Sequence, residues 1–209
     1  MGFYTESDMD FTPLFNSTSF KSFYIEKSKL YEQVKKDSVK VVEFISVKNK
    51  NFNFIECKSS FPNIKQPNEK QAIMKKAMEQ ALKEAYPKES QKDINKTVKQ
   101  YFKSDLDIDS QKIYAKLHHS IDLFLTYQLG QECAGADFPS LGNPDVFNAK
   151  FSNYDIVFYL ILKGDQFSPL ACEDIQIVLQ KRLKPLKKLW GVDIKVIPEK
   201  KARKLKFIH

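Results

Sequence analysis

Two glutamates and a lysine are placed where they could hold a divalent cation. Residues 54–59 read Phe-Ile-Glu-Cys-Lys-Ser, so that Glu56 and Lys58 are two positions apart, and residues 41–44 read Val-Val-Glu-Phe, with Glu43. Alternate residues of a β-strand point to the same face, so Glu56 and Lys58 share a face if their segment is a strand. Carboxylate oxygens are the ligands that hard divalent cations prefer, and two carboxylates side by side could share one such ion.

The residues between the two segments predict a β-hairpin that brings the carboxylates together. Lys48-Asn-Lys-Asn51 is typical of a tight turn with a two-residue loop, between strands expected over about 39–47 and 52–59. In this register Glu43 faces Glu56, with Cβ atoms about 5 Å apart. Both faces of the hairpin are otherwise mostly apolar, so we expect both to be covered. A buried ionised carboxylate costs several kcal/mol unless it is paired or ligated, and a cation between the two would offset their repulsion.

The rest of the sequence predicts the elements that must hold the hairpin. Residues 20–27 alternate as in a strand and would complete a three-stranded antiparallel meander. Apolar residues at helical spacing predict helices over 68–86, 90–103 and 110–130, the first of them packed on the sheet. Residues 155–162 are almost continuously hydrophobic, which predicts a central strand buried on both faces.

The C-terminal third predicts a β-α-β unit. Ser168 and Pro169 are expected to begin a helix that ends at Gly191 and is kinked or split at Pro185. A strand over 192–197 follows and should run parallel to the hydrophobic strand, because a helical crossover joins them. The predicted fold class is α/β (α+β mixed), a central mixed β-sheet of about five strands with an N-terminal antiparallel meander, flanked by helices.

A chain of 209 residues has room for one domain of ordinary size. We expect residues 1–18 to form an irregular N-terminal arm and residues 19–198 to form a single α/β domain. That domain would carry a helical insertion at about 88–131 and a long loop at 131–152. Residues 199–209 are rich in lysine and are expected to be a basic C-terminal tail.

An acidic residue on one hairpin strand and a Glu-x-Lys triplet on the next resemble the PD-(D/E)xK nuclease superfamily. The resemblance covers the hairpin closely, and the expected helix at 68–86 and strand at 155–162 loosely. It implies that residues 19–198 form a restriction-endonuclease-like domain. It also implies a Mg²⁺- or Mn²⁺-dependent endonuclease or exonuclease that hydrolyses DNA or RNA, of a kind often found in phage-defence or mobile-element systems.

The resemblance also implies roles for individual residues. Glu43, Glu56 and the backbone carbonyl of Cys57 would bind the metal ion, and Lys58 would position or deprotonate the attacking water. In this role the metal activates the water and neutralises the charge that builds on the phosphate.

The identity of the first metal ligand stays open between several acidic residues. The superfamily usually has Asp where this chain has Glu43, and no Pro-Asp pair precedes the hairpin. Asp37 lies six residues upstream with the same strand parity, and Glu26 on the preceding strand could be a third acidic group in the same cleft.

The charge of the chain favours an anionic partner. The formal net charge is +8, from 34 Lys and Arg against 26 Asp and Glu. Lysine supplies most of the positive charge, so contacts with nucleic acid should be mainly to phosphates. The alternative is a solvated basic surface. The residues expected to contact phosphates are Lys181, Arg182, Lys184, Lys188, Lys201, Arg203 and Lys204.

The composition of the chain indicates its cellular location and the kinds of cysteine site it can form. Its three cysteines show no C-x-x-C spacing, which argues against a zinc ribbon or a disulfide framework and for a cytoplasmic location. No apolar run approaches the roughly 20 residues that a membrane span needs.

Two functions therefore remain. The first is the metal-dependent nuclease, acting as a homodimer or with a separate targeting subunit, as is common for nucleases of this size. The alternative is a non-catalytic module on a degenerate nuclease-like fold that binds nucleic acid or a protein partner.

Overall fold

The hydrophobic run at 155–162 forms a strand in the interior of a five-stranded sheet. In the computed structural model of the chain, β6 (Asp155–Leu162) lies between β5 (Asn51–Lys58) and β7 (Asp193–Pro198) and is parallel to both. Every residue of β6 except the first is buried, as expected for a strand covered on both faces. The structure describes residues 4–6, 9–11, 21–48, 50–62, 69–101, 105–129 and 144–208.

The other half of the sheet is the predicted antiparallel meander. The strand order is β3-β4-β5-β6-β7, in which β3 (Lys21–Tyr24) and β4 (Phe44–Lys48) complete the sheet. Lys48 pairs with Asn51 and Phe44 pairs with Ile55, so the predicted hairpin register is confirmed. The hairpin strand β4 is shorter than expected, because it begins at Phe44 and not near residue 39. The mixed α/β fold class is thus confirmed.

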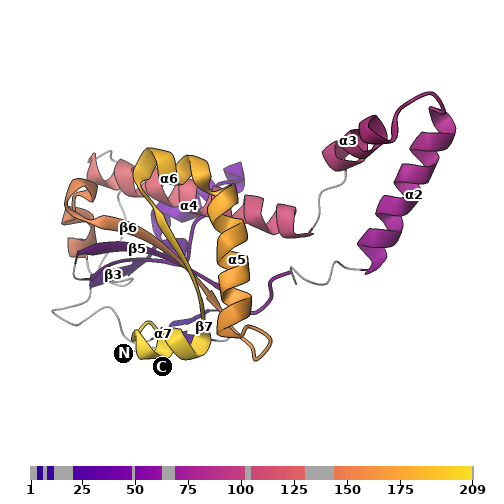
Figure 1. Cartoon of the computed structure of the whole chain (residues 1–209). Helices are drawn as coiled ribbons and strands as arrows, with labels where there is room; N and C mark the ends of the chain where they lie inside the picture. Colours follow the sequence, from indigo (N-terminus) through magenta and orange to yellow (C-terminus); the bar gives the residue numbers. More distant parts are fainter. Residues whose placement is uncertain are drawn as a thin grey trace. The chain divides into compact units, whose positions relative to one another are not determined.

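Helices and a small hairpin cover the two faces of the sheet (Figure 1). On one face, α4 (Asp105–Gln128) packs Phe124 against Phe52, with 4.5 Å between the ring centroids. On the other face, Phe11 packs against Phe44 at 4.3 Å. That second core also contains residues from β5, β6, β7 and the C-terminal segment, among them Ile55, Cys57, Tyr159, Ile197, Ala202 and Phe207.

The helix predicted between Ser168 and Gly191 is split near Pro185, as expected. The Ser168 hydroxyl accepts a hydrogen bond from the Ala171 amide at 3.2 Å and caps α5 (Pro169–Arg182). A second helix, α6 (Lys184–Trp190), begins with Pro185 in its first turn. The two helices are followed by β7, which is parallel to β6 as the crossover rule requires. α5 also protects the sheet edge, because the Gln176 side chain accepts a hydrogen bond from the Val196 amide at 2.9 Å.

The described parts of both chain ends form more regular structure than the sequence predicted. Part of the expected irregular arm forms an antiparallel pair, β1 (Tyr4–Glu6) and β2 (Met9–Phe11), and Phe11 bridges to Ile208. The expected basic tail begins with the helix α7 (Glu199–Lys204), in which Ala202 is fully buried. Both segments cover apolar residues on the second face of the sheet, because Phe11 and Ala202 belong to the core there. Short helical segments are η1 (Ile25–Lys27), α1 (Lys29–Val34), η2 (Lys35–Asp37), η5 (Pro144–Asn148) and η6 (Phe151–Asn153).

The chain divides into two compact units, residues 1–60 with 112–209 and residues 61–111. The second unit holds α2 (Glu69–Ala85) and α3 (Gln91–Tyr101), close to the predicted bounds. The expected packing of α2 on the sheet stays a prediction. Most of α4 belongs to the sheet unit, and the insertion expected over about 88–131 stays a prediction. The predicted loop at 131–152 lies outside the described residues up to residue 143.

Candidate active site

Glu43 and Glu56 converge on a single cation, the ammonium group of Lys116 in α4. The Lys116 Nζ atom lies 2.9 Å from the Glu56 carboxylate and 3.4 Å from Oε1 of Glu43. The two glutamate side chains are only 4% and 2% exposed, whereas the lysine side chain is 20% exposed. The predicted proximity of the two carboxylates is therefore present, on the side of the sheet that α4 covers.

The end of the strand pairing explains how Glu43 reaches this place. The last pair between the hairpin strands is Phe44 with Ile55, and continued pairing would set Val42 opposite Cys57. Instead, the Cys57 amide donates a hydrogen bond to Oε2 of Glu43 at 2.8 Å, and the Val42 amide donates to the Ser120 hydroxyl at 2.9 Å. The Glu43 carboxylate thus replaces a backbone carbonyl as the partner of β5. This is also why β4 begins only at Phe44.

Burial and like charge make Glu43 the member of the cluster that takes up a proton. The pKa of Glu43 is raised well above 4.5, first by burial and then by the charge of Glu56 and a hydrogen bond to it, against the opposing effect of Lys116. Burial alone would lower the pKa of Lys116, but the charges of Glu56 and Glu43 outweigh it and raise that pKa. The lysine therefore remains charged, and Glu43 can gain or lose a proton.

Two more residues border the cluster. The Glu26 amide donates to the backbone carbonyl of Glu43 at 3.4 Å, and the charge of Glu26 contributes to the raised pKa of Glu43. Burial and the charge of Glu26 raise the pKa of the Tyr31 hydroxyl, while Lys116 acts to lower it. Glu26, one of the two alternative acidic residues, thus lies near the carboxylates.

Two of the predicted residues, Lys58 and Asp37, do not join the cluster. Lys58 makes no hydrogen bond or ion pair with either carboxylate among the described residues, although it is on the predicted strand. Side chains two positions apart on a strand stand about 6.6 Å apart, and Lys116 reaches Glu56 directly from the covering helix. Cys57 contacts Glu43 through its backbone amide, and the metal-binding role of its carbonyl stays a prediction. Asp37 is exposed at the end of η2 and makes no contact with Glu43 or Glu56.

Sequence reasoning missed Lys116, Ser120 and Tyr31. A signal for Lys116 and Ser120 was available. They are four positions apart and lie among the apolar residues that were expected to form the buried side of α4. Polar residues inside such a stripe need partners in the core. The Ser120 hydroxyl has two, since it also donates to the Lys116 carbonyl at 2.6 Å. Tyr31 carried no comparable signal.

The chemistry of the two carboxylates fits a Mg²⁺ or Mn²⁺ ion. Within the described residues, no group of three or more His, Cys, Asp or Glu side chains could hold a metal. Magnesium, however, is commonly held by only one or two protein carboxylates, with water and substrate phosphate as the other ligands. Glu43 and Glu56 already surround one positive charge, that of Lys116, and they are the residues that would hold the metal.

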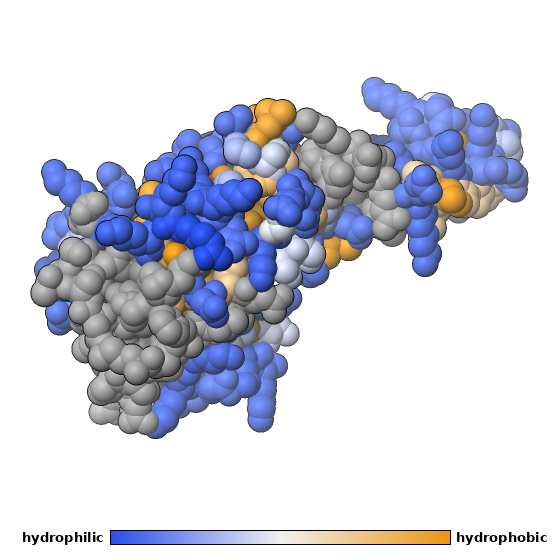
Figure 2. Space-filling model, turned by 90° about the horizontal axis from the view of Figure 1, so that it is seen from below, coloured by the Kyte–Doolittle hydropathy of each residue, from blue (hydrophilic) through white to orange (hydrophobic). Residues whose placement is uncertain are grey.

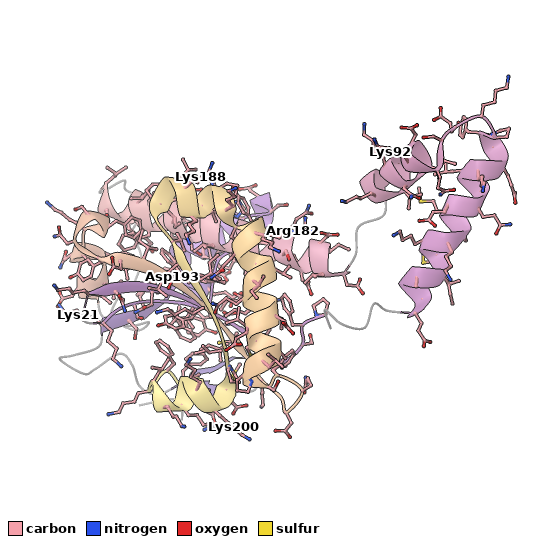
Figure 3. The ribbon with its side chains drawn as sticks, viewed as in Figure 1. Lys21, Lys92, Arg182, Lys188, Asp193 and Lys200 are labelled. Atoms are coloured by element: carbon pink, nitrogen blue, oxygen red, sulfur yellow. The ribbon has the colours of Figure 1, made fainter. Side chains whose placement is uncertain are left out.

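The predicted basic residues lie on two opposite sides of the sheet. Those at the end of α5 and on α6 are on the side of α4, because Trp190 contacts Phe151, which in turn packs against Phe52. Those on α7 are on the other side, where Ala202 belongs to the second core. Figure 3 shows Lys188 above the sheet and Lys200 below it. Figure 2 views the α7 side, where hydrophilic residues predominate.

Comparisons of the chain with known protein families, with curated proteins and with solved structures find no match. Over the part of the chain that the structure describes, no helix combines the length and the apolar character needed to cross a membrane.

Proposed function

We propose that the chain is a metal-dependent nuclease that hydrolyses phosphodiester bonds of DNA or RNA, with Glu43 and Glu56 as the ligands of Mg²⁺ or Mn²⁺. The observation that supports it is the convergence of two buried carboxylates on one cation, at the point where the hairpin strands separate. A buried ion cluster is a weak source of stability, because desolvation of the charges cancels much of their attraction. A functional role accounts for the cluster better.

Each residue of the cluster has a distinct task in this proposal. The metal, when bound, would activate water and offset negative charge on the phosphate. The hydrogen bond from the Cys57 amide fixes the orientation of the Glu43 carboxylate. Lys116, kept charged by its neighbours, would donate hydrogen bonds to the substrate phosphate when it leaves the carboxylates. Its partial exposure gives the ammonium group a route to a bound substrate.

A cleavage assay with matched lysine variants tests the proposal. Single- and double-stranded DNA and RNA would be incubated with the purified protein and Mg²⁺ or Mn²⁺. We expect Glu56→Gln and Lys116→Met to lower the cleavage rate by about 100-fold or more, as for loss of a group that acts directly in catalysis. Lys112→Met, one turn earlier on the same helix and exposed, should keep the rate. Activity that survives both Glu56→Gln and Lys116→Met would overturn the assignment.

The burial of the carboxylates favours a second candidate, a non-catalytic module. Both glutamate side chains are nearly inaccessible, and Lys116 already neutralises part of their charge. In this alternative the cluster keeps α4 in register with the strand ends, and a basic surface binds nucleic acid or an acidic protein. Salt-dependent binding of nucleic acid without cleavage of any substrate, with either metal, would favour the module over the nuclease.

A further inference from the structure

The ammonium group of Lys116 occupies the place between the two carboxylates where a metal ion would bind. Both oxygens of Glu56 lie 2.9 Å from the Lys116 Nζ atom, and Oε1 of Glu43 lies 3.4 Å from it. The other oxygen of Glu43, Oε2, accepts the hydrogen bond from the Cys57 amide at 2.8 Å. The carboxylate oxygens that could hold a cation therefore already hold one, and the chain itself supplies it.

The ammonium group and a divalent metal ion cannot share this place. A metal ion that takes an oxygen from each glutamate needs the oxygens that now face Nζ. Two cations side by side in a buried site would also repel each other strongly, because the local dielectric constant is low. Lys116 neutralises one of the two carboxylate charges, whereas a divalent ion neutralises both. The metal should therefore replace the ammonium group once its concentration is high enough.

Lys116 is the member of the cluster that can move. Its side chain is 20% exposed, whereas those of Glu43 and Glu56 are 4% and 2% exposed. The Cys57 amide holds the Glu43 carboxylate in place, and Glu56 lies within β5. A lysine has a flexible stem and a strongly hydrated ammonium group. A change of its side-chain rotamer can therefore take the charge to solvent while α4 stays folded.

We propose that Lys116 closes the metal site of the free protein, and that a divalent metal ion binds by displacing its ammonium group towards solvent. This inference rests on the proposed function, because it takes Glu43 and Glu56 as the metal ligands. The competing lysine lowers the apparent affinity for the metal, since only the fraction of molecules with an open site can bind it. The displaced ammonium group is then available to a substrate phosphate, with which it can form charge-assisted hydrogen bonds.

Manganese binding to the full chain tests the competition. Electron paramagnetic resonance measures free Mn²⁺, so a titration gives the dissociation constant without any cleavage reaction. Lys116→Met should bind Mn²⁺ about tenfold more tightly than the wild type, which is within the usual range for coupled sites, because no ammonium group competes. Lys112→Met removes the same charge from an exposed position one turn earlier and should keep the wild-type affinity. Glu56→Gln should lose the site.

Lysine acetylation provides a second measurement, on the wild-type chain, that does not depend on a stable lysine variant. Mass spectrometry after brief treatment with an acetylating reagent gives the relative rates at Lys116 and Lys112. Mn²⁺ should raise the ratio of the Lys116 rate to the Lys112 rate about fivefold or more, because the displaced amine becomes accessible. In Glu56→Gln, which should not bind the metal, Mn²⁺ should leave this ratio unchanged.

Two results would overturn the displacement of Lys116. One is a folded Lys116→Met variant that binds Mn²⁺ no more tightly than the wild type. The other is an acetylation ratio that stays constant in wild-type protein to which Mn²⁺ is bound. Either result would leave Glu43 and Glu56 as metal ligands and the proposed nuclease standing. Absence of Mn²⁺ binding in both the wild type and Lys116→Met would instead overturn the displacement and the metal-dependent function together.

Discussion

At the scale of single residues, the cluster of Glu43, Glu56 and Lys116 is held together by partial neutralisation. Two ionised carboxylates and one ammonium leave a net negative charge in a buried place, and a proton on Glu43 removes it. The raised pKa of Glu43 means that its carboxylate takes up this proton more readily than an exposed glutamate does. The same cluster that suits a metal ion is therefore sensitive to the loss of any one of its charges.

Removal of the lysine should reveal this dependence in the stability of the fold. We expect Lys116→Met to lower the free energy of unfolding by about 3 kcal/mol, because it leaves two buried carboxylates without their cation. Urea denaturation at pH 7 measures the change, with the exposed Lys112→Met as control. The double variant Lys116→Met, Glu56→Gln should recover part of the loss, since the two groups are coupled. Equal effects of Lys112→Met and Lys116→Met would contradict the structural role of the ion pair.

The raised pKa of Glu43 predicts the direction of a pH effect. Between the unfolded value near 4.5 and the higher folded value, the folded state binds more protons than the unfolded state. The contribution of Glu43 to stability therefore falls as the pH rises through this window, by up to about 1.4 kcal/mol per pH unit. Glu43→Gln keeps an acceptor for the Cys57 amide but has no titrating group, so this decrease of the unfolding free energy with pH should disappear. Urea denaturation from pH 4 upwards checks this, and an equally steep fall in the variant would contradict the assignment to Glu43.

At the scale of elements, the position of α4 decides whether the cluster forms. Ser120 joins the helix to the segment before β4, because its hydroxyl accepts from the Val42 amide and donates to the Lys116 carbonyl. This contact stops the strand pairing from continuing to Val42 and so leaves the Cys57 amide for Glu43. One serine thereby couples the helix, the strand end and the carboxylate.

Loss of the Ser120 hydroxyl should therefore destabilise the fold. Ser120→Ala leaves the buried Val42 amide without its acceptor, at an expected cost of about 1–3 kcal/mol in unfolding free energy. Thr126→Ala is a matched control on the same helix, because the half-buried Thr126 also donates to the carbonyl four residues earlier, in an exposed hydrogen bond. Thermal or urea denaturation of both variants gives the comparison. A Ser120→Ala variant as stable as Thr126→Ala would show that the Val42 amide finds another partner.

At the scale of the whole molecule, the basic residues that were predicted to contact phosphates are distributed over two sides of the sheet. The carboxylates, α4 and the lysines of α6 share one side, and the basic residues of α7 are on the other. Nucleic acid that reaches Glu43 and Glu56 should therefore be bound through the α6 side. Arg203 is paired with Glu199 within α7, which reduces the charge that α7 can offer to a phosphate.

The salt dependence of nucleic-acid binding can distinguish the two sides. Replacing Lys184 and Lys188 by Gln should weaken binding and reduce the slope of log K against log salt by about 0.9 per lost phosphate contact with double-stranded DNA. Replacing Lys201 and Lys204 by Gln removes the same charge from the α7 side and should change the slope little. Fluorescence anisotropy at several salt concentrations measures both. Equal losses for the two double variants would contradict a binding site confined to the α6 side.

Short-range patterns in the sequence were sufficient to predict most of the elements and one part of the site. The Lys48-Asn51 turn determined the hairpin register, and the hydrophobic run determined β6. Ser168 and Pro185 determined where the C-terminal helices begin. These features depend on residues close together in the chain, so periodicity, capping and turn chemistry reveal them. The approach of Glu43 to Glu56 followed from the same local register.

Contacts between distant residues were decided only by the tertiary structure. Lys116 is 60 residues from Glu56 and 73 from Glu43, and its position depends on how α4 packs on the sheet. The sequence predicted a divalent cation between the two carboxylates, and the family resemblance implied Lys58, on the same strand as Glu56, as the catalytic lysine. The basic C-terminal segment became a helix with a buried Ala202 because the second face of the sheet required a cover. The sequence by itself determined the two carboxylates and their register, whereas the cation that joins them was determined by packing, which local rules do not encode.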